Sequence, residues 1–182
     1  MRPGVNLGAS IGPGFRMSGW TWQPKINDER AVLFVPSGAI FNRRQQPLDR
    51  RKAEPYGPVI ADLRRQFSNH QWLDLGLVGF REAETFRESR GAVIVFDVPD
   101  LVDRTPWAHR RELLRVLPVV ELLNERPVAG LAYRLEETEK AGELFALTNG
   151  VPGLEGIVGR NIHAPYAQGD SPQMAKARWL KG

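Results

Sequence analysis

Short runs of apolar residues, separated by glycine, proline or polar residues, recur along the chain, and each run predicts a β-strand. The most uniform run is residues 92–98, in which β-branched side chains dominate. Residues 30–35 and 39–43 flank the turn Pro36-Ser37-Gly38 and predict a hairpin. Further strands are predicted at residues 71–79, 128–135 and 154–160.

Three other segments have apolar residues at the three- and four-residue spacing of a helix with one buried face. Pro118 ends the second of these helices, and Asn149-Gly150 ends the third. Acidic residues in the first turn of the third helix suit the helix dipole. The three helices are predicted at residues 59–67, 107–117 and 136–147.

Residues 1–19 differ from the rest of the chain because glycine and proline are frequent there. Gly8, Gly12 and Gly14 lack the preceding strand of a phosphate-binding loop, and Pro13 interrupts them. No internal repeat or low-complexity tract divides the remainder. We therefore expect a flexible arm over residues 1–19, followed by one domain over residues 20–182.

The composition excludes several classes of protein. The 182 residues contain no cysteine, which excludes disulfides and thiolate zinc sites, and the three histidines lack the spacing of metal ligands. No apolar run is long enough to predict a membrane span, and the N-terminus lacks the apolar core of a signal peptide, so a cytoplasmic location is expected. The formal net charge of +4 is compatible with a phosphate-rich partner.

The stretch from Trp20 to Arg30 holds the first candidate for chemistry. Lys25 follows an apolar, aromatic lead-in, and Arg30 comes shortly after it. Partial burial and a nearby cation both favour a neutral amine, so a lysine in this setting becomes a nucleophile if its pKa falls from about 10.4 towards neutrality. The same residues are also typical of a charged turn between two strands, and the stretch alone leaves both interpretations open.

Several segments follow one another in a fixed order along the chain, from about Trp20 to Trp179. Residues 24–30 read Pro-Lys-Ile-Asn-Asp-Glu-Arg, and residues 155–158 read Glu-Gly-Ile-Val. The other segments are Phe41-Asn42-Arg43-Arg44, Trp72-Leu73-Asp74, Val95-Phe96-Asp97-Val98 and Lys176-Ala177-Arg178. Together they resemble the adenylation domain of ATP-dependent DNA ligases. Residues 24–30 resemble the first motif of that family, Lys-x-Asp-Gly-x-Arg, and residues 155–158 match its fourth motif, Glu-Gly-x-Val; the other similarities are weaker.

The resemblance implies an α+β fold of the ATP-dependent DNA ligase-like nucleotidyltransferase type, with antiparallel sheets flanked by helices. It implies that Lys25 attacks the α-phosphorus of ATP and holds AMP as a phosphoramide, with Arg30 and Lys176 as further catalytic residues. Phe96 would stack on the adenine, and Glu155 and Asp74 would hold Mg²⁺ or Mn²⁺. The full set of implied nucleotide-binding residues is Lys25, Arg30, Arg43, Asp74, Phe96, Glu155, Lys176 and Arg178.

Two departures from the family pattern lie close to these residues. Asn27-Asp28 replaces the Asp-Gly that follows the lysine, so a charge is lost at one position and the conformational freedom of glycine at the next. After Asp74 the family has Gly-Glu, whereas this chain has Leu75-Gly76, so a carboxylate expected to contact the ribose or the metal is missing. Asp74 is a partial substitute for it. Lys181 is an alternative to Lys176.

The resemblance therefore predicts the catalytic core of an ATP-dependent DNA ligase, which joins 5′-phosphate and 3′-hydroxyl ends at nicks in double-stranded DNA during repair or replication. It also implies an OB-fold domain or partner protein outside this chain. A binding module of the same fold with weakened catalysis is a second hypothesis, because of the two departures. An RNA ligase or capping-type nucleotidyltransferase is a third.

Overall fold

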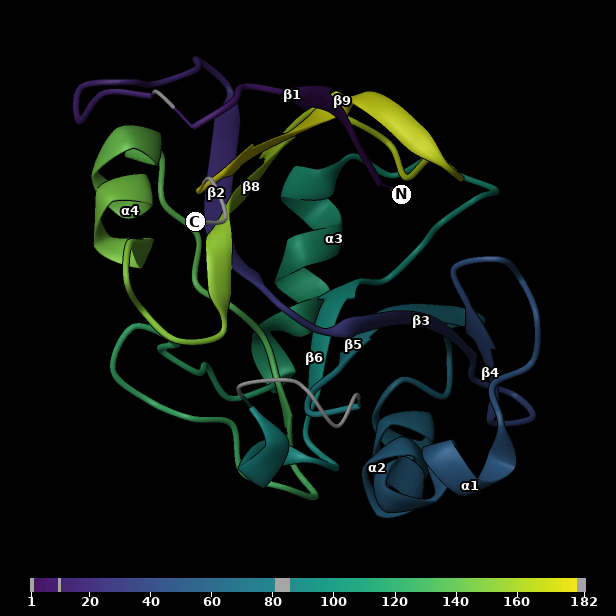
Figure 1. Cartoon of the computed structure of the whole chain (residues 1–182). Helices are drawn as coiled ribbons and strands as arrows, with labels where there is room; N and C mark the ends of the chain where they lie inside the picture. The colour runs from purple at the N-terminus through teal and green to yellow at the C-terminus, as the bar shows by residue number, and fades with distance from the viewer. Residues whose placement is uncertain (1, 10, 81–85, 180–182) are drawn as a thin grey trace. The chain divides into compact units, whose positions relative to one another are not determined.

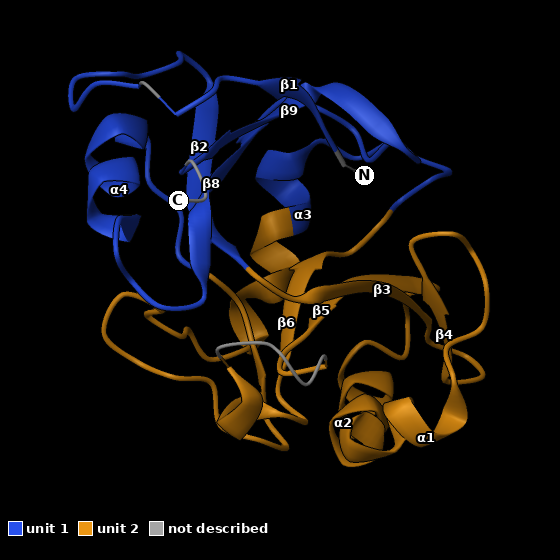
Figure 2. Cartoon of the chain, viewed as in Figure 1, with its two compact units in different colours: residues 1–26, 100–110, 136–182 blue, residues 27–99, 111–135 orange. Residues whose placement is uncertain are grey.

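The computed structural model describes residues 2–9, 11–80 and 86–179, and the chain forms two compact units (Figures 1 and 2). Unit 1 contains residues 1–26, 100–110 and 136–182. Unit 2 contains residues 27–99 and 111–135. The sequence predicted one domain over residues 20–182, whereas the structure divides this stretch directly after Ile26, at the end of the strand that carries Lys25.

Unit 1 is built on a four-stranded sheet in the order β1-β9-β8-β2. β9 runs antiparallel to β8, and β8 runs antiparallel to β2, whereas β1 is parallel to β9. The helix α4 (Ala141–Thr148) packs against β2 and β8. The strands are β1 (Arg2–Asn6), β2 (Trp20–Ile26), β8 (Leu154–Asn161) and β9 (Asp170–Arg178).

Two aromatic contacts hold the core of unit 1 together. The indole of Trp22 is fully buried opposite Gly159, where a Cβ atom would come within 2.5 Å of the ring, so glycine leaves the space that the indole fills. Trp179 stacks on Phe145 of α4, with 3.8 Å between ring centroids, and its Nε1 donates to Thr148 Oγ1 at 3.1 Å. The stacking and the hydrogen bond hold Trp179, the residue after β9, against α4.

Residues 1–19 were expected to form a flexible arm, but part of this segment belongs to the sheet. β1 pairs with β9 through Val5–Ala175 and Asn6–Lys176, and the N–H of Leu7 donates to the carbonyl of Lys176 at 2.9 Å. Without β1 this side of β9 would have unpaired backbone groups, which is a general reason for an edge strand to be covered. The expectation of a flexible arm is therefore wrong for Arg2–Asn6.

Unit 2 contains a five-stranded sheet in the order β4-β3-β5-β6-β7, in which only the β6–β7 pair is parallel. α2 (Gly57–Gln66) is fastened near the sheet, because Arg64 Nε donates to the Val35 carbonyl at 2.8 Å. It buries Val59, Ile60 and Leu63. The strands are β3 (Glu29–Phe34), β4 (Ala39–Asn42), β5 (Trp72–Leu77), β6 (Val93–Asp97) and β7 (Ala132–Tyr133).

The remaining helices are short. α3 (Trp107–Leu113) continues into the 3₁₀ helix η3 (Leu114–Val116), as expected for a helix that ends before Pro118. The others are α1 (Arg50–Ala53), η1 (Glu54–Tyr56) and η2 (Arg87–Ser89). In the described part of the chain, no helix combines the length and hydropathy needed to cross a membrane.

The mixed fold with antiparallel sheets and few helices confirms the predicted α+β class. The prediction was wrong at residues 136–140, because α4 begins only at Ala141. The backbone of Thr138 is instead engaged with β2: its carbonyl accepts from the Trp22 N–H at 2.8 Å, and its N–H donates to the Trp22 carbonyl at 3.0 Å. A residue that bridges to a strand in this way cannot also belong to a helix.

Candidate functional site

Lys25 lies near the end of β2, opposite Gly156 of β8. The next pair in the register is Ile26 with Leu154, so Glu155 is an extra residue on β8 and forms a β-bulge. A bulge re-aims the side chain of the extra residue, and the Glu155 carboxylate accepts a hydrogen bond from Lys25 Nζ. The two side chains are 17% and 20% exposed, so the pair is sheltered yet reachable from solvent.

The backbone geometry explains why glycine follows Glu155. Gly156 has a φ of 134°, which side-chain-bearing residues rarely adopt. A Cβ atom there would lie only 2.0 Å from the carbonyl oxygen of Ala177 on β9. The Glu-Gly pair therefore works as a unit: the glycine permits the backbone path that brings the glutamate to Lys25.

Two further cations come from β9. Arg178 is paired with Gly156 in the register, and its Nη2 lies 3.6 Å from Glu155 Oε2, the oxygen that also contacts Lys25 Nζ. Lys176 lies two residues earlier on β9, so it projects from the same face of the strand as Arg178. Unit 1 thus brings together an amine, a carboxylate and a guanidinium on three neighbouring strands, with a second amine nearby.

The candidate residues of unit 2 form a separate cluster. Arg30 binds Asp74 with two parallel hydrogen bonds, from Nε to Oδ1 at 2.5 Å and from Nη2 to Oδ2 at 2.6 Å. The Asp74 side chain is only 2% exposed, against 28% for Arg30. Asp74 lies opposite the fully buried Asp97 in the β5–β6 register, so the guanidinium of Arg30 supplies positive charge where two carboxylates are close.

Phe96 is also placed by a bulge. Asp74 pairs with Asp97 and Leu75 pairs with Val95, which leaves Phe96 as the extra residue on β6. Its ring is 8% exposed, and the guanidinium carbon of Arg30 lies 4.9 Å from the ring centroid. Stacking of Phe96 on a base stays a prediction, as does a metal-binding role for Asp74, both of whose oxygens are engaged by Arg30.

Sequence reasoning treated Asp28 and Gly76 as two independent departures, but the structure brings them together. A Cβ atom on Gly76 would lie 2.0 Å from Asp28 Oδ2 and 2.7 Å from the Phe96 ring. The carboxylate of Asp28 therefore fills the space beside Gly76, next to Phe96. Among the described residues other than glycine, positive φ occurs only at Gln45 and Arg104, so position 28 does not need the freedom of glycine.

Two of the candidates named from the sequence remain, Arg43 and Lys181. Arg43 directly follows β4 and is exposed. Lys181 lies outside the described residues. Within the described residues, no group of three or more histidine, cysteine, aspartate or glutamate side chains is arranged to hold a metal ion. Glu155 alone still fits Mg²⁺ in the way this ion is often held, by one or two carboxylates together with substrate phosphates.

Comparison with known proteins identifies the fold. The ligase domain of M. tuberculosis LigD matches 97% of this chain with a TM-score of 0.63 at 16% identity. A Lig E DNA ligase matches 98% with a TM-score of 0.57 at 14% identity, and Chlorella virus DNA ligase-adenylate matches 97% with a TM-score of 0.57 at 16% identity. The chain thus has the fold of the nucleotidyltransferase domain of ATP-dependent DNA ligases.

The chain matches only part of each of these proteins, and it matches them in structure rather than in sequence. The chain spans 59% of the LigD ligase domain, 70% of the Lig E protein and 67% of the Chlorella virus ligase. A search of protein-family models finds no match, and none of the curated proteins matches the chain. The likeness is therefore one of fold.

Proposed function

We propose that the chain is the catalytic core of an ATP-dependent DNA ligase, which forms a lysyl-AMP intermediate and seals nicks in double-stranded DNA. The observation that carries this proposal is the contact of Lys25 with Glu155 on the bulge of β8, with Arg178 beside the same carboxylate. The fold supports it, since a neighbour of the same fold, mycobacterial DNA ligase D, was solved in complex with ATP. The lack of cysteine fits a reducing, cytoplasmic setting.

In the first step Lys25 Nζ, as the neutral amine, attacks the α-phosphorus of ATP. The nitrogen–phosphorus bond forms, the bond from the α-phosphorus to the bridging oxygen breaks, and pyrophosphate leaves while the amine releases a proton. Lys176 and Arg178 neutralise the charge that develops on the triphosphate. Covalent capture divides a difficult joining reaction into easier steps.

In the later steps the AMP passes to the 5′-phosphate at a nick. The neighbouring 3′-hydroxyl then attacks that phosphate, which forms the phosphodiester bond and releases AMP. Arg43 binds phosphate oxygens, a task to which the guanidinium fork is suited. Arg30 takes the same role only where its fork leaves Asp74. An OB-fold domain or a partner protein contributes the remaining contacts to the duplex.

Glu155 has two roles in this scheme. Its carboxylate positions Lys25, but an adjacent negative charge also favours the ammonium form of a lysine. Attack therefore requires that Glu155 be drawn away from the amine. Glu155 would hold Mg²⁺ or Mn²⁺, and the bound ion would supply charge neutralisation on the phosphates.

The test is incubation of the full chain with Mg²⁺ and ATP labelled on its α-phosphate, followed by a denaturing gel. We expect a labelled protein band that is absent from Lys25→Ala. Lys140→Ala is the matched control, because it removes an exposed lysine of unit 1 and should keep the band. An unlabelled wild-type chain, or a labelled Lys25→Ala chain, would rule the proposal out.

The pairing of Lys25 with Glu155 also favours a second candidate, a nucleotide- or DNA-binding module of this fold without transfer activity, because a paired ammonium is no nucleophile. In that case wild type and Lys25→Ala bind ATP or duplex equally, and neither acquires label. The same gel with labelled GTP, and with nicks flanked by RNA, separates an RNA ligase or capping-type enzyme.

A further inference from the structure

Positive charge is concentrated in one short segment of unit 2, residues 43–52, which we call the basic segment. Its cations are Arg43, Arg44, Arg50, Arg51 and Lys52. Five cations and the one carboxylate of Asp49 give it a formal net charge of +4, which equals the net charge of the entire chain. The rest of the sequence is therefore neutral overall, and the basic excess that suits a phosphate-rich partner lies here.

The backbone of the basic segment is held in place. After β4 the chain turns back along the same strand: the N–H of Asn42 donates to the Gln46 carbonyl, and the N–H of Leu48 donates to the Ile40 carbonyl, each at 2.9 Å. Asp49 then caps α1 by accepting from the Lys52 N–H at 3.1 Å. β4 and α1 consequently lie at one edge of unit 2 (Figure 2).

The side chains of the basic segment are turned to solvent. All five cations are exposed. Within residues 2–9, 11–80 and 86–179, none of the five forms an ion pair. The Lys52 ammonium lies 6.0 Å from the centroid of the Phe80 ring. The carboxylate of Asp49 is directed to the backbone of α1, so it pairs with none of the five cations.

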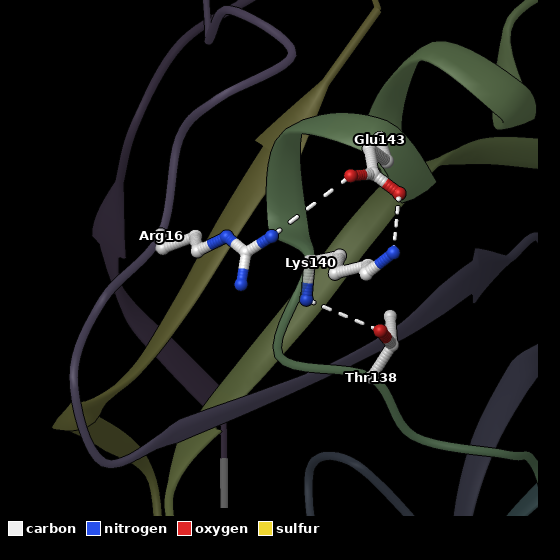
Figure 3. A network of polar contacts seen from close by, with 4 residues as sticks. All are labelled: Arg16, Thr138, Lys140 and Glu143. Atoms are coloured by element: carbon white, nitrogen blue, oxygen red, sulfur yellow. Dashed lines mark hydrogen bonds and ion pairs between the residues drawn. The ribbon is translucent and has the colours of Figure 1, made fainter.

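Other exposed cations of this protein, unlike those of the basic segment, are paired with carboxylates (Figure 3). Arg16 and Lys140 of unit 1 both lie near Glu143, with nitrogen–oxygen distances of 4.0 and 3.2 Å. Arg115 of unit 2 likewise lies 2.8 Å from Glu112. These three cations are also exposed to solvent, but each lies beside a carboxylate.

We propose that the basic segment, through its cations other than Arg43, binds the phosphate backbone of duplex DNA. The choice of DNA as the polyanion rests on the proposed function. Residues 46–48, which run back along β4, span about 10 Å. Duplex DNA carries about one charge per 1.7 Å of helix axis. Cations at the two ends of this stretch, Arg44 on one side and Arg50 and Arg51 on the other, therefore reach several phosphates at once.

The test uses a triple variant, Arg44→Gln, Arg50→Gln and Arg51→Gln. Arg43 is left intact because it is assigned to nucleotide binding. The affinity of the full chain for a nicked duplex and an intact duplex is measured from about 50 to about 200 mM salt. Each lost phosphate contact lowers the slope of log affinity against log salt by about 0.9, so we expect a loss of roughly two to three, independent of DNA sequence.

The matched control is a second triple variant, Arg16→Gln, Lys140→Gln and Arg115→Gln, which removes the same formal charge from paired cations. We expect its salt slope to equal that of wild type. Equal losses in the two triple variants would assign binding to overall charge and overturn the proposal. An unchanged slope in the basic-segment variant, or wild type that binds only single strands or RNA, would overturn it as well.

Covalent labelling by ATP is measured on the same preparations. The basic-segment variant should label like wild type, because none of its three substitutions touches Lys25 or its partners. A chain that binds duplex through the basic segment but takes no label would refute the proposed ligase activity alone. A chain that labels normally but has an unchanged salt slope would refute the basic segment alone.

Discussion

Each unit of this protein contains one cation–carboxylate pair that links two neighbouring strands, and the two pairs differ in design. Lys25 meets Glu155 through a single amine on a flexible side chain, and both groups are partly open to solvent. Arg30 meets Asp74 through two parallel hydrogen bonds, and the carboxylate is almost completely buried. A compact ammonium can leave its partner by rotation of its side chain, whereas a forked guanidinium must break two bonds together.

The difference separates two tasks. The Lys25–Glu155 pair is made by a single amine between two partly buried side chains, so opening it costs less than breaking the Arg30 fork and suits a group that has to react. Breaking a buried pair leaves an uncompensated charge and costs about 3–5 kcal/mol. Arg30 and Asp74 are therefore expected to hold unit 2 together around Phe96, and the four predictions below test this division.

The largest effect is expected from Glu155→Gln. This change keeps the size of the side chain but removes the charge that positions Lys25 and accepts the metal. Covalent labelling should fall by about 10²–10³-fold, the usual cost of one preorganised charge-stabilising group. Thermal unfolding should change less than it does in Arg30→Gln, since neither side chain of the Lys25–Glu155 pair is as buried as that of Asp74. A large loss of stability would show that this pair is structural.

The second prediction concerns Arg30→Gln, which leaves Asp74 close to Asp97 without its cation. The free energy of unfolding should fall by about 3 kcal/mol, the lower end for a buried pair because Arg30 is partly exposed. Urea titration measures it. Arg30→Lys should restore less than half of the loss, because an ammonium cannot make the two-bond fork. Stability equal to wild type in Arg30→Gln would remove the contrast between the two pairs.

The third prediction asks whether the rigid packing around Arg30 extends to Asp28. Gly76→Ala places a methyl group against the Asp28 carboxylate and the Phe96 ring, and overpacking of this kind costs about 1–3 kcal/mol. Asp28→Gly removes one of the two obstacles. In the double variant the cost of Gly76→Ala should therefore be smaller by about 1 kcal/mol. Additive losses in urea titration would mean that the two positions are independent.

The smallest effect is expected at Asp100, a half-buried carboxylate of unit 1 that binds neutral donors in place of a cation. The hydroxyl of Thr105, followed by the backbone N–H of Asp103, lowers the pKa of Asp100 below its usual 3.8. A lowered pKa in the folded state adds stability above that value, and the stability is lost as the pH falls through the folded pKa.

Acid titration of unfolding, from about pH 5 to about pH 3, tests Asp100. Thr105→Val should lose less stability on acidification than wild type, because its folded and unfolded pKa values lie closer together. Thr105→Ser keeps a hydroxyl and should follow wild type. A Thr105→Val curve that coincides with wild type would show that the backbone donors alone hold the carboxylate.

The sequence predicted most elements of unit 2, because its signals are local. The apolar runs at residues 30–35, 71–79 and 92–98 became β3, β5 and β6, and the Pro-Ser-Gly turn closed the predicted hairpin. The sequence failed at β1 and β9, which pair the two ends of unit 1. A strand whose partner lies far along the chain has no short-range signal, and β1 has two residues, proline and glycine, that strand patterns disfavour.

The sequence named candidate site residues but not their arrangement. The resemblance selected Lys25, Glu155 and Arg178, and the structure places these three in contact. The two bulges that aim Glu155 and Phe96 could not be predicted, because a bulge is a property of two paired strands. The contact between Asp28 and Gly76 was missed for the same reason: one residue follows β2, the other lies on β5, and only the folded backbone brings them together.

The strand β1 has a consequence for the order in which the units can form during synthesis. Val5 is made 170 residues before its partner Ala175. The sheet of unit 1 must therefore wait until β9 has emerged, whereas unit 2 is complete once residue 135 has emerged. Domains generally fold as units during synthesis, so we expect unit 2 to reach its native packing first, while the Lys25 strand is still without β8.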